Sequence, residues 1–161
     1  MNKAYTLIEI LVTITIIGLV FLAGYAGFQD FNRRQAIASV SRLIRSDLKL
    51  AQEQALAGKK PELDEDQNSV SCQGSLQYYG FEVLSDTSYK VSAYCPNEII
   101  LKTINLDSNL ILTDPVPNPI KFKPIGQGTN ITESTSSYVV VTMAQNNYSQ
   151  TITIGSNGDI N

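Results

Sequence analysis

One stretch near the start of the chain restricts what this protein can fold into. Nineteen consecutive residues, Ile10 to Phe28, carry no charge, and as a helix they would span roughly 28 Å, close to the hydrocarbon thickness of a bilayer. The hydroxyls of Thr13 and Thr15 can bond to the helix backbone, so these two polar residues are compatible with a membrane-spanning helix. A retained membrane helix is expected. A cleaved secretory signal peptide, whose apolar run is usually about 7–15 residues, and a buried soluble helix are the alternatives.

The composition of the chain excludes several classes of catalytic site. Its 161 residues suffice for a single domain, and its net charge of −3 is too small to indicate a protein that coats nucleic acid. Histidine is absent, which excludes Ser-His-Asp and Cys-His nucleophiles and histidine-containing zinc sites. Two cysteines are too few for a four-cysteine metal site. We therefore expect no catalytic residues, no metal and no cofactor, and a protein that is not an enzyme.

Glu9 is the energetically unfavourable residue of this region, because its carboxylate stands among apolar neighbours at the start of the uncharged run. A carboxylate near hydrocarbon costs several kcal/mol unless it reaches the interface or finds a partner. It could be an interfacial residue at a helix start, where the helix dipole favours an anion. It could also be an acid that pairs with a cation on another subunit. The spacing alone leaves both interpretations open.

The residues around Glu9 carry a resemblance. Met1-Asn2-Lys3-Ala4 followed by Tyr5-Thr6-Leu7-Ile8-Glu9 resembles the class III signal of type IV prepilins and type II secretion pseudopilins. This implies that prepilin peptidase removes residues 1–4 between Ala4 and Tyr5, and that Tyr5 is then N-methylated. It also implies that Glu9 acts in filament assembly, paired with the N-terminal amine of a neighbour. Ala4 and Tyr5 stand where the family usually has Gly and Phe.

A second helical pattern follows the apolar run. Apolar residues recur at spacings of 3 or 4, which is one stripe of an amphipathic helix. The stripe comprises Ile37, Val40, Ile44, Leu48, Ala51 and Ala55. Gly58 is expected to end the helix, with Pro61 soon after. Four segments are expected: a leader over 1–4, a transmembrane and assembly helix over 5–28, an amphipathic helix half over 29–58 and a β head over 59–161.

From Leu76 onward the hydrophobic period changes to two, which is typical of half-buried strands. The expected strands are 77–84, 89–95, 99–106, 109–113, 120–125, 137–143 and 149–154. Asn146-Asn147 and Asn157-Gly158 indicate turns, and Pro115, Pro117 and Pro119 indicate an irregular crossing. The predicted fold class is α+β: a pilin-like long N-terminal helix packed on an antiparallel β-sheet.

Cys72 and Cys95 are the two cysteines of the chain. If the head is exported, a disulfide between them is expected, because exported compartments are oxidising. Free structural thiols are the alternative. A redox-active pair is not favoured, since the spacing is not Cys-x-x-Cys.

Asp64, Asp66 and Asn68 have the spacing that opens an EF-hand calcium loop. Ser69 and Ser75 stand where that loop needs Gly and Glu, so an EF-hand is not expected. A looser calcium site and a solvated acidic loop both remain as interpretations, of which the acidic loop is favoured.

The charge pattern argues against nucleic acid as the main partner. Residues 29–60 carry seven basic and three acidic side chains, a net +4, whereas residues 62–161 carry four basic and eleven acidic ones, a net −7. An acidic head repels phosphate backbones. A local DNA contact at Lys121 and Lys123, with Arg33 and Arg34, is possible but not favoured. A solvent-facing row of lysines that guards a sheet edge is the simpler interpretation.

Looser similarities favour one branch of the pilin family. Leu43–Ala57, Ile120–Gly126 and the segment from Thr151 to Ile160 resemble the GspH/FimT-type minor pilins and pseudopilins. The resemblance implies a structural subunit of a type IV pilus or type II secretion pseudopilus. Its expected partners are other pilin subunits, prepilin peptidase, the assembly ATPase and platform, and the bacterial cytoplasmic membrane, with a cytoplasmic N-terminus and an exported head. The alternative function is a tip-located binding module for DNA uptake or adhesion.

Overall fold

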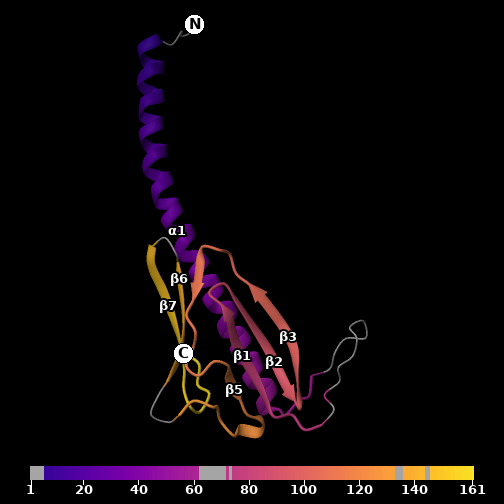
Figure 1. Ribbon diagram of the computed structural model, residues 1–161. Coiled ribbons are helices and arrows are strands. Elements are labelled where there is room, and N and C mark those ends of the chain that lie inside the picture. Colours follow the sequence, from indigo (N-terminus) through magenta and orange to yellow (C-terminus); the bar gives the residue numbers. More distant parts are fainter. Residues whose placement is uncertain (1–5, 62–71, 73, 133–135, 144–145) are drawn as a thin grey trace. The chain divides into compact units, whose positions relative to one another are not determined.

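The computed structural model describes residues 6–61, 72, 74–132, 136–143 and 146–161. In these residues a long helix, α1 (Leu7–Leu56), is followed by strands and a short 3-10 helix (Figure 1). The strands are β1 (Tyr78–Ser85), β2 (Ser88–Cys95), β3 (Asn97–Asn105), β4 (Leu110–Leu112), β5 (Ile120–Phe122), β6 (Ser137–Met143) and β7 (Asn146–Ile154), and the 3-10 helix is η1 (Pro124–Gly126). The chain forms two compact units, residues 1–36 and 37–161, and we describe each by itself.

Gly58 ends α1 as the sequence predicts. Its φ of 59° is left-handed, a conformation that favours glycine. The Gly58 amide donates to the Ala55 carbonyl at 3.0 Å, and the Lys59 amide donates to the Gln54 carbonyl at 3.1 Å. These two bonds form a Schellman motif, which satisfies carbonyls that would otherwise have no partner at the helix end.

The apolar stripe of α1 forms one wall of the core in residues 37–161, as predicted. Five of its six members are buried and Val40 is partly buried against the same cluster. The other wall comes from alternate residues of the strands, such as Tyr79 and Phe81 of β1 and Val91 of β2. Figure 1 shows β1, β2 and β3 running alongside this part of α1. Burial of these side chains against the helix supplies most of the stabilisation of the head.

The described residues of the head form two sheets, where the sequence led us to expect one. The first has the order β3-β2-β1-β5 and the second has the order β4-β6-β7, and all the pairings are antiparallel. The proline-rich segment, with cis bonds before Pro117 and Pro119, connects β4 of the second sheet to β5 of the first. The alternation of hydrophobic residues predicts where the strands lie but not which strands pair, so it could not show that the strands divide into two sheets.

Two strand boundaries differ from the prediction by three residues. Strand β5 ends at Phe122, three residues early, because Pro124 has no amide hydrogen and Ile125 has a left-handed φ of 55°. Lys123 therefore lies outside the strand that was expected to carry it. Strand β7 begins at Asn146, so Asn146 and Asn147 belong to a strand rather than to the expected turn.

Around β5, two asparagine side chains bond to backbone N–H and C=O groups, where a neighbouring strand would otherwise supply the partners. The Asn118 side chain accepts from the Val83 amide at 3.1 Å and donates to the Val83 carbonyl at 2.9 Å. The Asn130 side chain accepts from the Lys121 amide at 2.8 Å and donates to the Pro119 carbonyl at 2.9 Å. A carboxamide has the same donor and acceptor pair as a peptide group, so it can extend a ladder at its edge.

A carboxylate on the apolar stripe is buried between α1 and the first sheet. Asp47 is 5% exposed. The Tyr89 hydroxyl donates to its Oδ2 at 2.8 Å, and Lys102 Nζ donates to Oδ1 and Oδ2 at 2.8 and 3.0 Å. Burial, followed by this bond to Asp47, raises the pKa of Tyr89. The cluster therefore ties β2 and β3 to the helix through charge-assisted hydrogen bonds.

Replacing Asp47 by alanine is expected to lower the free energy of unfolding by about 2–3 kcal/mol, because it leaves the Tyr89 hydroxyl and the Lys102 ammonium without their acceptor. Since the Lys102 side chain is 39% exposed, water offsets part of the loss, and the effect is smaller than for a fully buried pair. Urea unfolding of the two full-length chains in detergent measures it. The control is Glu53→Ala, an exposed acid on the same helix, which should cost less than about 0.5 kcal/mol. Equal losses in the two variants would contradict a structural role for Asp47.

Candidate functional site

The first compact unit is a helix with an exposed apolar surface. Leu7 and Phe21 are 83% and 73% exposed, and the other large apolar residues between them are also exposed. By length and composition, α1 is apolar enough to cross a membrane. The Thr13 hydroxyl donates to the Ile10 carbonyl at 2.8 Å, and the Thr15 hydroxyl donates to the Leu11 carbonyl. As predicted, both threonine hydroxyls are bonded within the helix. Neither therefore presents an unsatisfied hydrogen-bond donor on the apolar surface.

Glu9 lies in the first turn of this helix. The Glu9 amide donates to the Thr6 side-chain oxygen at 3.4 Å and to the Thr6 carbonyl at 3.1 Å, so Thr6 is the N-cap. The Glu9 carboxylate is therefore at the third helical position, where the positive end of the helix dipole favours an anion. The Glu9 side chain is exposed, so in the single chain its carboxylate is accessible to a partner.

The role of Thr6 was not predicted from the sequence, although a local signal for it is present. Thr-x-x-Glu at residues 6–9, directly before an apolar run, is the spacing of a capping box. The cap fixes where the helix starts and so fixes the place of Glu9 on its first turn. Ala4 and Tyr5, the expected cleavage pair, lie outside the described residues, and cleavage and methylation there stay predictions.

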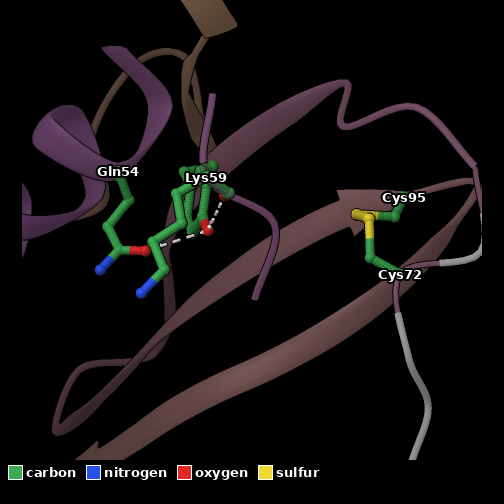
Figure 2. Close-up of a disulfide and its surroundings, with 5 residues drawn as sticks. Gln54, Lys59, Cys72 and Cys95 are labelled. Atoms are coloured by element: carbon green, nitrogen blue, oxygen red, sulfur yellow. Dashed lines mark hydrogen bonds between the residues drawn. A yellow bond between two sulfur atoms is a disulfide. The ribbon is translucent and has the colours of Figure 1, made fainter. Parts of the chain in front are cut away.

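A disulfide joins Cys72 to Cys95, and the structure thus contains the pairing expected for an exported head. It links the segment that leads into β1 to the last residue of β2, as Figure 2 shows. The hydroxyl of Tyr79, near the start of β1, donates to the Lys59 carbonyl at 2.6 Å and lies 3.2 Å from Gln54 Oε1. The chain between α1 and β1 is therefore held at both of its ends.

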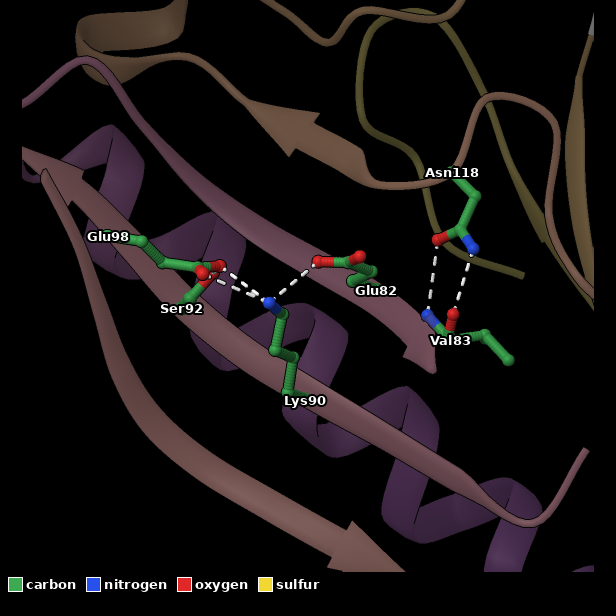
Figure 3. Close-up of polar contacts among 6 residues, drawn as sticks. All are labelled: Glu82, Val83, Lys90, Ser92, Glu98 and Asn118. Carbon is green, nitrogen blue, oxygen red and sulfur yellow. Dashed lines mark hydrogen bonds and ion pairs between the residues drawn. The ribbon is translucent and has the colours of Figure 1, made fainter. Parts of the chain in front are cut away.

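The outer face of the first sheet carries an ion-pair cluster on β1, β2 and β3 (Figure 3). Lys90 Nζ lies 2.9 Å from Glu82 Oε2 and 2.9 Å from Glu98 Oε1, and the Ser92 hydroxyl donates to Glu98 at 2.9 Å. The bond from Lys90 is the main reason why the pKa of Glu98 lies below its ordinary value. Partial burial alone would lower the pKa of Lys90, but its bonds to Glu98 and Glu82 raise it overall.

This cluster predicts a pH-dependent contribution to stability. Because the pKa of Glu98 is lowered in the fold, its contribution is present above the ordinary value of 4.5 and is lost as the pH falls through the folded-state value. Glu98→Gln should therefore be less stable than wild type at pH 7 by up to about 1 kcal/mol, since the pair is partly solvated. The difference should disappear near pH 3 in urea unfolding. Asp107→Asn, at an exposed acid, is the control, and a difference that persists unchanged at pH 3 would contradict the assignment.

The lysines considered for DNA contact lie at or beside the edge strand β5. Lys121 Nζ lies 4.6 Å from the centroid of the Tyr78 ring, which stacks on Tyr94 with 5.1 Å between centroids. Lys123 follows the strand end and is exposed. Arg33 and Arg34 belong to the other compact unit, and Arg34 pairs with Asp30 at 3.1 Å. The structure thus engages Lys121 with an aromatic ring, and the DNA contact, which the sequence did not favour, stays untested.

The candidate calcium residues Asp64, Asp66 and Asn68 lie outside the described residues. Within the part of the chain that the structure describes, no three His, Cys, Asp or Glu side chains form a cluster that could hold a metal ion.

Comparison with known proteins identifies the N-terminal segment. The family model for the prokaryotic N-terminal methylation motif matches residues 1–25. No curated protein and no solved structure matches the chain. Proteins with this motif are processed by prepilin peptidase and assemble with other pilins in membrane machinery. The motif extends into an apolar helix that is followed by antiparallel sheets, so the chain carries the type IV pilin signal at its N-terminus and has a pilin-like α+β architecture.

Proposed function

We propose that this chain is a minor pilin or pseudopilin of the GspH/FimT type, a structural subunit that is drawn from the cytoplasmic membrane into a type IV pilus or type II secretion pseudopilus. The observation that carries the proposal is the methylation motif at residues 1–25, which runs without a break into the exposed apolar helix. A signal peptide would be removed together with its apolar run. Here the head core is built on the continuation of the same helix, beginning at Ile37.

Assembly begins with processing. Prepilin peptidase cuts between Ala4 and Tyr5, and methylation of the new amino group on Tyr5 follows. Thr6 then caps the helix of the mature chain, and Glu9 stands on its first turn. A cut at this position leaves the whole apolar surface in the mature subunit, where it can serve as both membrane anchor and filament contact.

The exposed apolar surface must be shielded from water, by lipid before assembly and by neighbouring helices in the filament. Each large apolar side chain that leaves water contributes about 1.5–3 kcal/mol, so residues 7–28 require either lipid or neighbouring helices. Within a bundle of such helices the Glu9 carboxylate would be unstable alone. Paired with the N-terminal amine of a neighbouring subunit it is tolerated, and the pair sets the axial register of the two helices.

The proposed topology places residues 1–4 in the cytoplasm and the head outside the cytoplasmic membrane. The Cys72–Cys95 disulfide supports an exported head, because disulfides persist in oxidising compartments. The assembly ATPase and the platform protein are separate partners that supply the energy and the site of insertion. The finished filament lies in the periplasm or at the cell surface.

Sheared filaments from the native cell test the proposal. The subunit should be present in the filament fraction at a small, constant ratio to the main pilin, and should be absent from it in a strain without prepilin peptidase. A ratio near one would make it a major subunit. Complete absence from filaments of the wild-type strain, with the chain retained in the membrane, would contradict the proposal.

A further inference from the structure

Strand β7 lies at one side of the second sheet, and its outer edge faces away from β6 (Figure 1). After β7 the chain turns back along the end of this edge. The Gly155 amide donates to the Asp159 carbonyl at 2.9 Å, and Thr153 and Asn161 exchange two backbone hydrogen bonds of 3.0 Å each. Ile160, between Asp159 and Asn161, is partly buried against the core. The outer edge of β7 therefore already pairs with an extended segment, and this segment adds an apolar side chain to the core.

Beyond Thr153 the same edge presents backbone groups that can pair with a further strand. In an antiparallel sheet, residues whose N–H and C=O groups face one neighbouring strand alternate with residues that face the other. Since Thr153 faces outward, Thr151 and Ser149 do so too. The pair formed by Thr151 and Val140 agrees, because the Val140 carbonyl accepts from the Thr113 amide, on the side away from β7, at 3.0 Å. Within the part of the chain that the structure describes, no backbone group pairs with Ser149 or Thr151 on the outer side.

The composition of β7 leaves this edge without the usual protection. Natural sheets commonly protect an open edge with charged residues, prolines, bulges or a covering segment. Strand β3, at the edge of the first sheet, carries Glu98 and Lys102, and its register with β2 shifts at Leu101. Strand β7 contains no charged residue and no proline, and its register with β6 is regular from Ser149 to Ile154. Such an edge is expected to pair with another chain.

We propose that the outer edge of β7 binds an extended segment of another protein, which pairs antiparallel with Ser149 and Thr151 and continues the line of Asn161. The side chains of this segment alternate between two environments. The side chain opposite Ile152 points toward the core, as that of Ile160 does, and should be apolar. Those opposite Ser149 and Thr151 lie on the solvent side and should be hydroxyl residues, which form favourable cross-strand pairs with threonine and serine. Backbone hydrogen bonds supply the affinity, and the alternation of side chains supplies the specificity.

A second copy of this chain fits the edge less well than a separate extended segment. Its own β7 has residues 159–161 folded along one end of the same edge, and its register with β6 is irregular before Ser149. Two such strands, each fixed in its sheet, could pair only between Ser149 and Ile152. An extended segment is not fixed in a sheet, so it can follow the edge at both ends of this stretch.

A fluorescein-labelled peptide that alternates valine and threonine, with a lysine at each end, tests the proposal on the full-length chain in detergent. Its valines correspond to Ile160 and its threonines to Asn161, so the threonine amides face β7. Fluorescence anisotropy should show saturable binding. N-methylation of the threonine amides should weaken binding by at least about tenfold, because it removes backbone donors and leaves carbonyls of β7 unpaired. N-methylation of the valine amides is the matched control, and it should weaken binding by less than about threefold, because these amides face away from β7.

Amide hydrogen exchange, measured by NMR on the same sample, locates the bound peptide. The Ser149 and Thr151 amides should exchange at least about tenfold more slowly with saturating peptide, whereas the Gln150 amide, which faces β6, should not change. No saturable binding, equal weakening by the two methylated peptides, or no protection of Ser149 and Thr151 would overturn the proposal. Protection that grows with protein concentration in the absence of peptide would show that a second copy occupies the edge, and would overturn a separate partner. Neither measurement requires filaments, so the result is independent of the proposed function.

Discussion

Replacing Glu9 by glutamine is expected to lower the incorporation of this subunit into filaments by at least about 100-fold, because loss of one partner from a buried ion pair costs about 3–5 kcal/mol. The carboxylate stands on the capped first turn of α1, within a surface that is otherwise apolar. Glutamine has the same shape but cannot neutralise the amine of a neighbour. The unpaired amine would then have to enter the helix bundle as a lone charge, and the subunit would remain in the membrane.

Measuring the cleavage of residues 1–4 distinguishes a defect in filament assembly from a defect in processing. The Glu9→Gln chain should still lose residues 1–4, because the expected cut precedes the helix, and its mass in the membrane fraction measures this directly. Asp30→Asn is the matched control: it is the same chemical change on the same helix, at an acid paired with Arg34 on an exposed surface. It should cost at most about 0.5 kcal/mol. If Glu9→Gln entered filaments as well as this control, the assembly role of Glu9 would be refuted.

Removing the disulfide by the double change Cys72→Ser and Cys95→Ser is expected to lower the free energy of unfolding by about 3 kcal/mol. The bond closes a loop with a sequence separation of 23 residues, and its loss restores the conformational freedom of that loop in the unfolded chain. Domains are commonly stable by only about 5–15 kcal/mol, so the loss is a large fraction of the total.

Urea unfolding in detergent, followed by tyrosine fluorescence because the chain has no tryptophan, measures the loss. A reducing agent applied to wild type should produce nearly the same shift and should leave the double variant unchanged, which controls for the serine substitutions. A loss below about 1 kcal/mol, on the chain-entropy scale for such a loop, would show that the bond is not an important constraint on the head.

The N-terminal part of this protein was predictable because its signals are local. The signal from Tyr5 to Glu9 is recognised from five consecutive residues. The uncharged run and the apolar stripe from Ile37 to Ala55 are recognised from length and from helical spacing alone. Gly58 is likewise a local signal, since one left-handed residue is enough to end the helix. The pattern of alternation in β1 and β2 gave their positions to within a residue or two.

The parts that could not be predicted depend on contacts between distant residues. The division into two sheets is a question of which strands pair, and Asp47 meets Lys102 across a separation of 55 residues. Asn130 bonds to β5 through its side chain, and no local pattern indicates this. Asp47 itself could have been recognised, because it lies three residues after Ile44 and four before Ala51, on the buried side of the helix.

Intact mass and N-terminal sequencing of the protein from its native membrane test the central claim most directly. We predict a chain that has lost Met1 to Ala4, begins at Tyr5 and carries one added methyl group there. A chain that still begins at Met1 in a cell with active prepilin peptidase would contradict the account. Cleavage near residue 27 would also contradict it, since the protein would then be a secreted β-rich domain without an assembly helix.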